Sequence, residues 1–117
     1  MNDRELLELA AKAIGIQIEC IEDEDGLGCA CKTGGEPAWV AWNPLTDDGD
    51  ALRLAVKLRM DIEIRVCVGY VSVAAYREPD SRIYVLEKPG DSAESLRRAI
   101  TRAAAGIGAR ITTEDGK

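Results

Sequence analysis

The spacing of apolar residues constrains this chain most, because it alternates between the 3.6-residue period of a helix and the two-residue period of a strand. Helical spacing covers residues 3–14, 51–58 and 93–107. Strand-like segments cover residues 16–21, 27–33, 37–42, 62–76 and 82–87, with a break at Gly69. The predicted order is α-β-β-β-α-β-β-α, with a mainly antiparallel sheet of about five strands and three helices. We expect a single α+β domain over residues 1–117, with a frayed tail from about residue 111.

Local signals mark the ends of these elements. Asn2 or Asp3 can cap the first helix, and Gly15 can close it in a left-handed conformation. In the first hairpin, a loop at residues 23–26 places Cys20 opposite Cys29 and gathers the apolar side chains on one face.

The stretch WNPLTDDGDALRLAVKL, residues 42–58, leads from a strand into the second helix. Three carboxylates crowd the point where that helix begins, and acids there accept hydrogen bonds from free backbone N–H groups. The helix carries two apolar stripes, one with Ala51 and Leu54 and another with Leu52 and Val56. We therefore expect it to be covered on more than one side, by its own chain or by another subunit.

Composition excludes several kinds of chemistry. The chain has no histidine, so Ser-His-Asp and Cys-His catalytic sites and histidine-based zinc sites cannot form within one chain. The cysteines, which form no C-x-x-C pair, are expected to be reduced thiols packed as small apolar residues: Cys20, Cys29, Cys31 and Cys67. The sequence contains neither an apolar run long enough for a membrane nor a signal peptide, which predicts the bacterial cytoplasm.

The charge is unevenly distributed along the chain. Residues 1–50 carry twelve acids and three bases, a balance of −9, whereas residues 51–117 carry nine acids and twelve bases, a balance of +3. The overall charge of −6 argues against broad binding of nucleic acid. The asymmetry either reflects an ordinary solvated surface or provides complementary faces for self-association.

Two groups of side chains are candidates for binding. The first surrounds the start of the second helix and consists of Trp42, Asn43, Asp47, Asp48 and Asp50. Helix capping accounts for these acids without a metal, and their spacing does not match an EF-hand, so neither metal nor cofactor is expected. The second group, Arg98 and Arg102 with Arg97, could clamp a phosphate or carboxylate, or could simply solvate the last helix.

Three segments together resemble the phage ABA sandwich domain, a family of small phage and prophage proteins. They are RELLELAAKAIG, WNPLTDDGDALRLAVKL and SLRRAITRAAAGIG, of which the second is the most specific. The resemblance implies an α/β/α sandwich, with helices on both sides of a central sheet, and it implies no reaction, cofactor or catalytic residue. Residues 16–38 match no part of the family pattern.

These observations favour a small phage or prophage accessory protein that acts by binding, either to a host protein or to itself as a homo-oligomer, without catalytic activity. An alternative is a protein that sequesters a small molecule or nucleotide, with the arginines of the last helix contacting its anionic groups. A third hypothesis is a metal-dependent enzyme that uses Asp47, Asp48 and Asp50.

Overall fold

A computed structural model describes residues 2–32, 38–78 and 81–115. The elements follow the predicted order, and the fourth strand is split at Gly69 as expected. They are α1 (Asp3–Ile14), β1 (Gln17–Asp23), β2 (Gly26–Lys32), β3 (Val40–Ala41), α2 (Asp48–Lys57), β4 (Asp61–Arg65), the 3-10 turn η1 (Val66–Val68), β5 (Tyr70–Glu78), β6 (Ser81–Glu87) and α3 (Ala93–Asp115).

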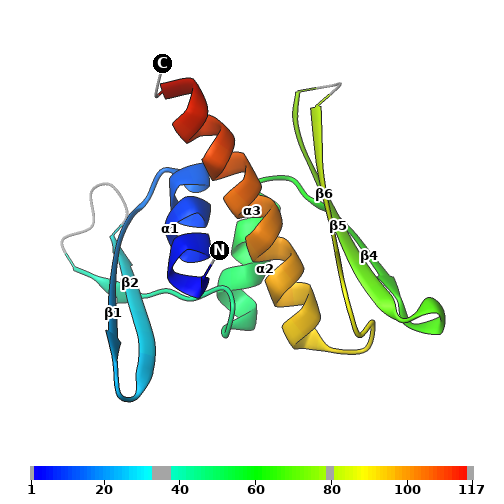
Figure 1. Cartoon of the computed structure of the whole chain (residues 1–117), viewed down its shortest axis with the longest axis horizontal. Helices are drawn as coiled ribbons and strands as arrows, with labels where there is room; N and C mark the ends of the chain where they lie inside the picture. The colour runs from blue at the N-terminus through cyan, green and yellow to red at the C-terminus, as the bar shows by residue number, and fades with distance from the viewer. Residues whose placement is uncertain (1, 33–37, 79–80, 116–117) are drawn as a thin grey trace.

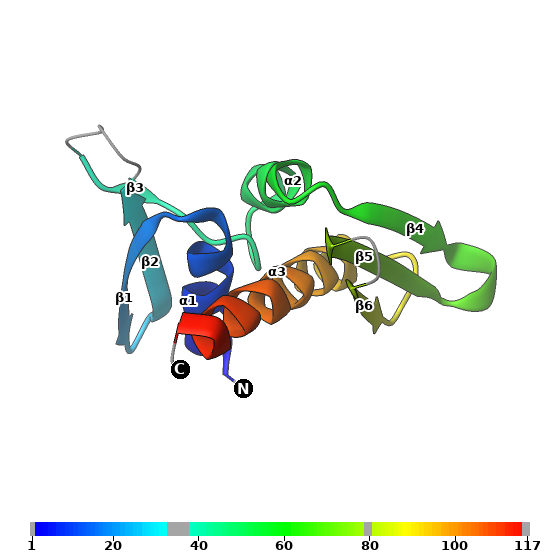
Figure 2. The same ribbon diagram turned by 90° about the horizontal axis from the view of Figure 1, so that it is seen from above.

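The strands form two antiparallel sheets, in the orders β1-β2-β3 and β4-β5-β6, so the prediction of one sheet with about five strands is wrong. The helices lie between the two sheets, which is the reverse of an α/β/α sandwich (Figures 1 and 2). In each sheet, strands that are neighbours in the sequence pair in antiparallel orientation. Alternation of apolar residues identifies the strands, but it does not determine whether two groups of strands join into one sheet. The expected register is confirmed, because Cys20 lies opposite Cys29 and Ile18 opposite Cys31.

The centre of the molecule is formed by α3, which packs against α1, α2, β5 and β6. Alanines line much of its buried surface, and Leu7, Leu54, Val71 and Val73 are the largest apolar side chains of the core that are almost completely buried. The approach of α1 to α3 is close at Gly108, where an added Cβ would collide with the carbonyl group of Leu9. Only glycine fits this helix contact without displacing backbone.

The helix ends follow their local signals. The side chain of Asn2 accepts a hydrogen bond from the N–H of Glu5 at 2.8 Å, and Gly15 closes α1 with φ +73°. The first residues of α3 are preceded by Ser92, whose Oγ accepts a hydrogen bond from the N–H of Ser95. Helix α3 continues to Asp115, past residue 111 where we expect fraying, and residues 116–117 lie outside the described part. Among the helices described, none has the length and apolar character that a membrane span requires.

Candidate functional site

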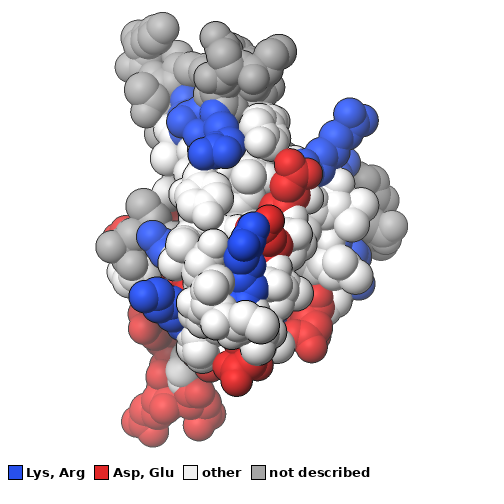
Figure 3. All heavy atoms as spheres, turned by 90° about the vertical axis from the view of Figure 1, so that its right-hand side faces the viewer, with Lys and Arg blue, Asp and Glu red and all other residues white. Residues whose placement is uncertain are grey.

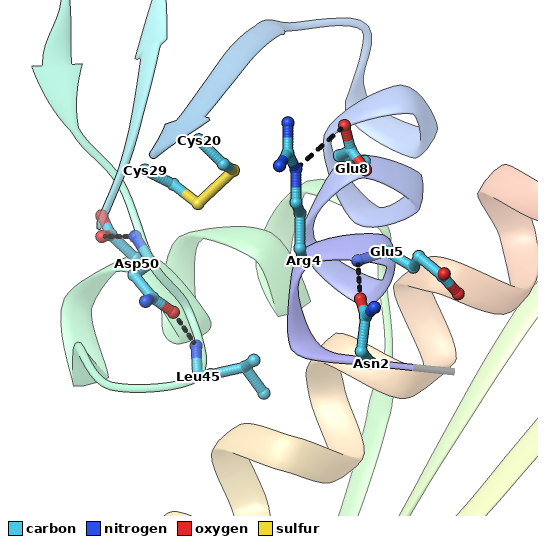
Figure 4. Close-up of a disulfide and its surroundings, with 9 residues drawn as sticks. Asn2, Arg4, Glu5, Glu8, Cys20, Cys29, Leu45 and Asp50 are labelled. Carbon is cyan, nitrogen blue, oxygen red and sulfur yellow. Dashed lines mark hydrogen bonds and ion pairs between the residues drawn. A yellow bond between two sulfur atoms is a disulfide. The ribbon is translucent and has the colours of Figure 1, made fainter. Parts of the chain in front are cut away.

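The acidic segment forms the first turn of α2 and the loop before it. Asp47 is the N-cap, because its carboxylate accepts a hydrogen bond from the N–H of Asp50 at 2.8 Å. Asp50 is only 8% exposed, and its carboxylate accepts from the N–H of Asn43 at 2.9 Å and from the guanidinium of Arg53 at 2.6 Å. The Asn43 side chain accepts in turn from the N–H of Leu45 at 3.0 Å (Figure 4). The prediction that an acid caps α2 is confirmed.

The remaining acid of this segment, Asp48, connects α2 to α3. The guanidinium of Arg97 lies 2.6 Å from the carboxylate of Asp48, and its Nε donates to the carbonyl oxygen of Leu45 at 3.0 Å. Asp47 and Asp50 share the guanidinium of Arg53, at 3.9 Å and 2.6 Å, whereas Asp48 pairs with Arg97. The carboxylates of the acidic segment are therefore neutralised by arginines of the protein itself. Across residues 2–32, 38–78 and 81–115, no three metal-ligating side chains of the His, Cys, Asp and Glu types lie close enough together to hold an ion.

The arginines of α3 do not converge on one point. Arg98 lies 3.6 Å from the carboxylate of Asp3 in α1, and Arg102 is hydrogen-bonded to Glu87 in β6. Each guanidinium thus bridges α3 to a different element. This arrangement differs from the anion clamp considered as an alternative, in which the arginines would point toward a common ligand.

Trp42 lies at a hollow of about 530 Å³ beside α2. Trp42 is 7% exposed and belongs to the core, and the walls of the hollow also include Ile16, Cys31, Arg53 and Lys57. Burial raises the pKa of the Cys31 thiol, and the nearby charge of Asp50 raises it further. That thiol is therefore protonated near neutral pH, which makes it a poor nucleophile and a poor metal ligand.

The expectation of four reduced cysteines is wrong in this structure, because Cys20 and Cys29 form a disulfide across the β1–β2 hairpin (Figure 4). The predicted register places the two side chains opposite each other on neighbouring strands, which is the condition for such a bond. Cys31 is a buried free thiol, and Cys67 is an exposed one.

The surface with the most exposed apolar side chains in a short segment lies on the β4–β6 sheet. We define the β4 patch as Ile62, Ile64, Val66 and Val68, which are 39%, 57%, 60% and 59% exposed. Ile62 and Ile64 pair with Val73 and Val71 of β5, so they share the sheet face on which α3 packs. Val71 and Val73 are covered, whereas β4 extends beyond that cover (Figure 2).

The second apolar stripe of α2 is also exposed. Leu52 and Val56 are 61% and 70% exposed, while Ala51 and Leu54 of the first stripe are buried. The described part of the chain therefore covers the first apolar stripe of α2 and leaves the second stripe uncovered. Figure 3, which looks onto the end of the molecule that carries the β4–β6 sheet, shows broad uncharged surface interrupted by a few charged side chains.

The outward face of the same sheet is more polar. Tyr70, Ser72, Ala74 and Tyr76 share this face, because the register of β4, β5 and β6 is regular as far as Tyr76. Here the guanidinium of Arg65 lies 2.6 Å from the carboxylate of Glu63. Their hydrogen bond lowers the pKa of Glu63, and the charge of Arg65 adds to that effect.

Sequence reasoning did not identify the β4 patch as a candidate surface. In IEIRVCV, apolar residues alternate with polar ones as they do in any half-buried strand. The only signal available was the continuation of the apolar positions through Val66 and Val68 after the last charged residue, Arg65. Alternation identifies an apolar face, but it does not show whether another element covers it.

The fold and surface thus define an α+β protein whose acidic segment is used internally and whose second sheet presents an apolar edge. No protein-family model matches the sequence, and no curated protein is found to be similar to it.

Proposed function

We propose that this chain is a small accessory protein of phage or prophage type that acts by binding another protein and has no catalytic activity. The observation that carries the proposal is the β4 patch together with Leu52 and Val56 of α2. Exposed apolar side chains grouped in this way are typical of surfaces that bind proteins. The resemblance of residues 42–58 to the phage ABA sandwich domain supports the phage or prophage origin.

The proposed setting is the cytoplasm of a bacterial host. In a reducing cytoplasm the Cys20–Cys29 bond would be present as two thiols. The disulfide lies in the β1–β2 hairpin, on the opposite side of the helices from β4 (Figure 1). Binding through the β4 patch therefore does not require the disulfide.

Aspartate substitutions at exposed apolar positions test this proposal. We expect Ile64→Asp and Val56→Asp to lose the bound protein, because a charge placed in a protein contact must be desolvated. Ile21→Asp is the matched control, since Ile21 is 72% exposed in β1 of the other sheet. Affinity purification from a bacterial lysate and native mass spectrometry would compare all three with the parent. Equal retention of partners by every variant would contradict the proposal.

A second candidate is the binding of a small anionic molecule at the hollow beside Trp42. The hollow has the volume of ligand-binding cavities, and it combines apolar walls with the cationic side chains of Arg53 and Lys57. A co-purifying mass lost from the Lys57→Glu variant would support this function. The metal-dependent enzyme has no observation in its favour, because Asp47, Asp48 and Asp50 each already bind protein groups.

A further inference from the structure

The edge strands of the two sheets differ in how well they could pair with a second copy of themselves. β1 carries only acidic charges, Glu19, Glu22 and Asp23, so no register brings opposite charges together. In β6, Arg82 and Glu87 lie on opposite faces of the sheet, and Glu87 is held by Arg102. β3 has only two residues. Among the described edges, β4 alone carries both signs on one face, with Asp61, Glu63 and Arg65.

Two-fold pairing of β4 with itself allows only a few registers. In an antiparallel pair, residues directly opposite each other share a face, so odd positions meet odd ones. An axis at Glu63 places two glutamates opposite each other, although it also places each Asp61 opposite an Arg65. An axis at Ile62 places Asp61 opposite the second copy's Glu63. An axis at Ile64 instead places each Glu63 opposite an Arg65 of the other copy. Only this last register avoids opposing like charges within Asp61–Arg65.

We propose that a second copy of this chain pairs with β4 in antiparallel orientation, on a two-fold axis at Ile64. This inference rests on the proposed function, and it names the partner. The two sheets then continue into one sheet of six strands, in which Glu63 and Arg65 of both copies alternate in sign on one face. Each carboxylate has one guanidinium 2.6 Å away within its own chain and gains another across the seam.

The same axis covers the apolar side chains on the other face. Ile64 meets its own copy, and the residues that pair directly are Glu63, Ile64 and Arg65, because the 3-10 turn η1 begins at Val66. Ile62 of each copy then lies at the margin of the seam, next to the start of η1 in the other copy. Helix α2 lies on the same side of the sheet as α3, beside β4 (Figures 1 and 2). The axis therefore brings the α2 helices of the two copies toward each other, where Leu52 and Val56 are exposed.

Cysteine cross-linking tests the register. In a Cys67→Ser background, we expect Ile64→Cys to form a disulfide-linked dimer on mild oxidation, because opposite residues of paired strands lie within the range of a disulfide. Ile62→Cys is the matched control, since its two copies are offset by four residues, or about 13 Å. Both positions are partly exposed, so the variants should fold. Equal cross-linking at the two positions, or none at Ile64→Cys, would overturn the proposed register.

A charge exchange tests the pairing without a covalent bond. Glu63→Arg places arginines opposite each other, so sedimentation velocity should show dimer affinity weaker by about tenfold. The double variant Glu63→Arg/Arg65→Glu restores both opposite-charge pairs and should return the affinity to that of the parent. The same affinity in the single variant and the parent, or no recovery in the double variant, would refute this pairing.

These outcomes are separable from failure of the proposed function. A chain that stays monomeric but retains a host protein, and loses it with Ile64→Asp, would refute self-pairing and leave the proposed function standing. A monomeric chain without any partner that depends on Ile64 would refute both.

Discussion

At the residue scale, Asp50 shows how much of the acidic segment is structural. Its buried carboxylate satisfies the backbone N–H of Asn43, seven residues earlier, and pairs with Arg53. The position of Asp47 as a cap follows from the sequence, because capping is a local interaction. The hydrogen bond from the N–H of Asn43 to the carboxylate of Asp50 could not be predicted from the sequence. The same holds for the pairing of Asp48 with Arg97, 49 residues away, because both interactions depend on the tertiary fold.

Removing the Asp50 carboxylate should therefore cost more than removing its neighbour. We expect Asp50→Ala to lower the free energy of unfolding by about 2 kcal/mol, because it leaves a part-buried N–H without an acceptor. Asp48→Ala should cost at most about 1 kcal/mol, since the Asp48 side chain is 78% exposed. Urea denaturation of the two variants measures both values, and equal losses would contradict the structural role assigned to Asp50.

At the element scale, apolar spacing predicts the helices, the strands and the β1–β2 register, because each depends on which face of one element is apolar. The separation into two sheets could not be predicted in this way. It depends on α1 and α3 packing between the sheets, and that packing requires small residues such as Gly108 at the contact. The alternating pattern of β4 likewise predicts an apolar face. Whether α3 covers that face depends on tertiary packing, which the pattern does not show.

Two glycines of α3 test this helix contact. Gly108→Ala should destabilise the protein by about 2 kcal/mol, because the new Cβ meets the backbone of Leu9. Gly106→Ala is the matched control. Its Cβ would lie 3.2 Å from Cγ2 of Ile83, a side chain that can adjust, and alanine favours the helix by up to about 1 kcal/mol. Thermal unfolding should separate the two variants clearly. A Gly108→Ala protein as stable as Gly106→Ala would show that α1 and α3 do not approach as closely as described.

At the scale of the whole molecule, the two sheets have different roles in this account. The β1–β3 sheet contributes to the hollow beside Trp42 and contains the disulfide, whereas the β4–β6 sheet provides the pairing edge. Pairing through β4 leaves the β1–β3 sheets at the far ends of the dimer, because the helices separate the two sheets (Figure 1). A dimer would thus bury the strand residues of the β4 patch, Ile64 above all, and keep two copies of the hollow accessible.

The most direct test of self-pairing is native mass spectrometry of the purified chain over a series of concentrations. The account predicts a species at twice the 12.6 kDa chain mass, which increases with concentration and is lost in Ile64→Asp but kept in Ile21→Asp. A chain that remains at 12.6 kDa at every concentration would contradict the central claim that β4 binds a second copy.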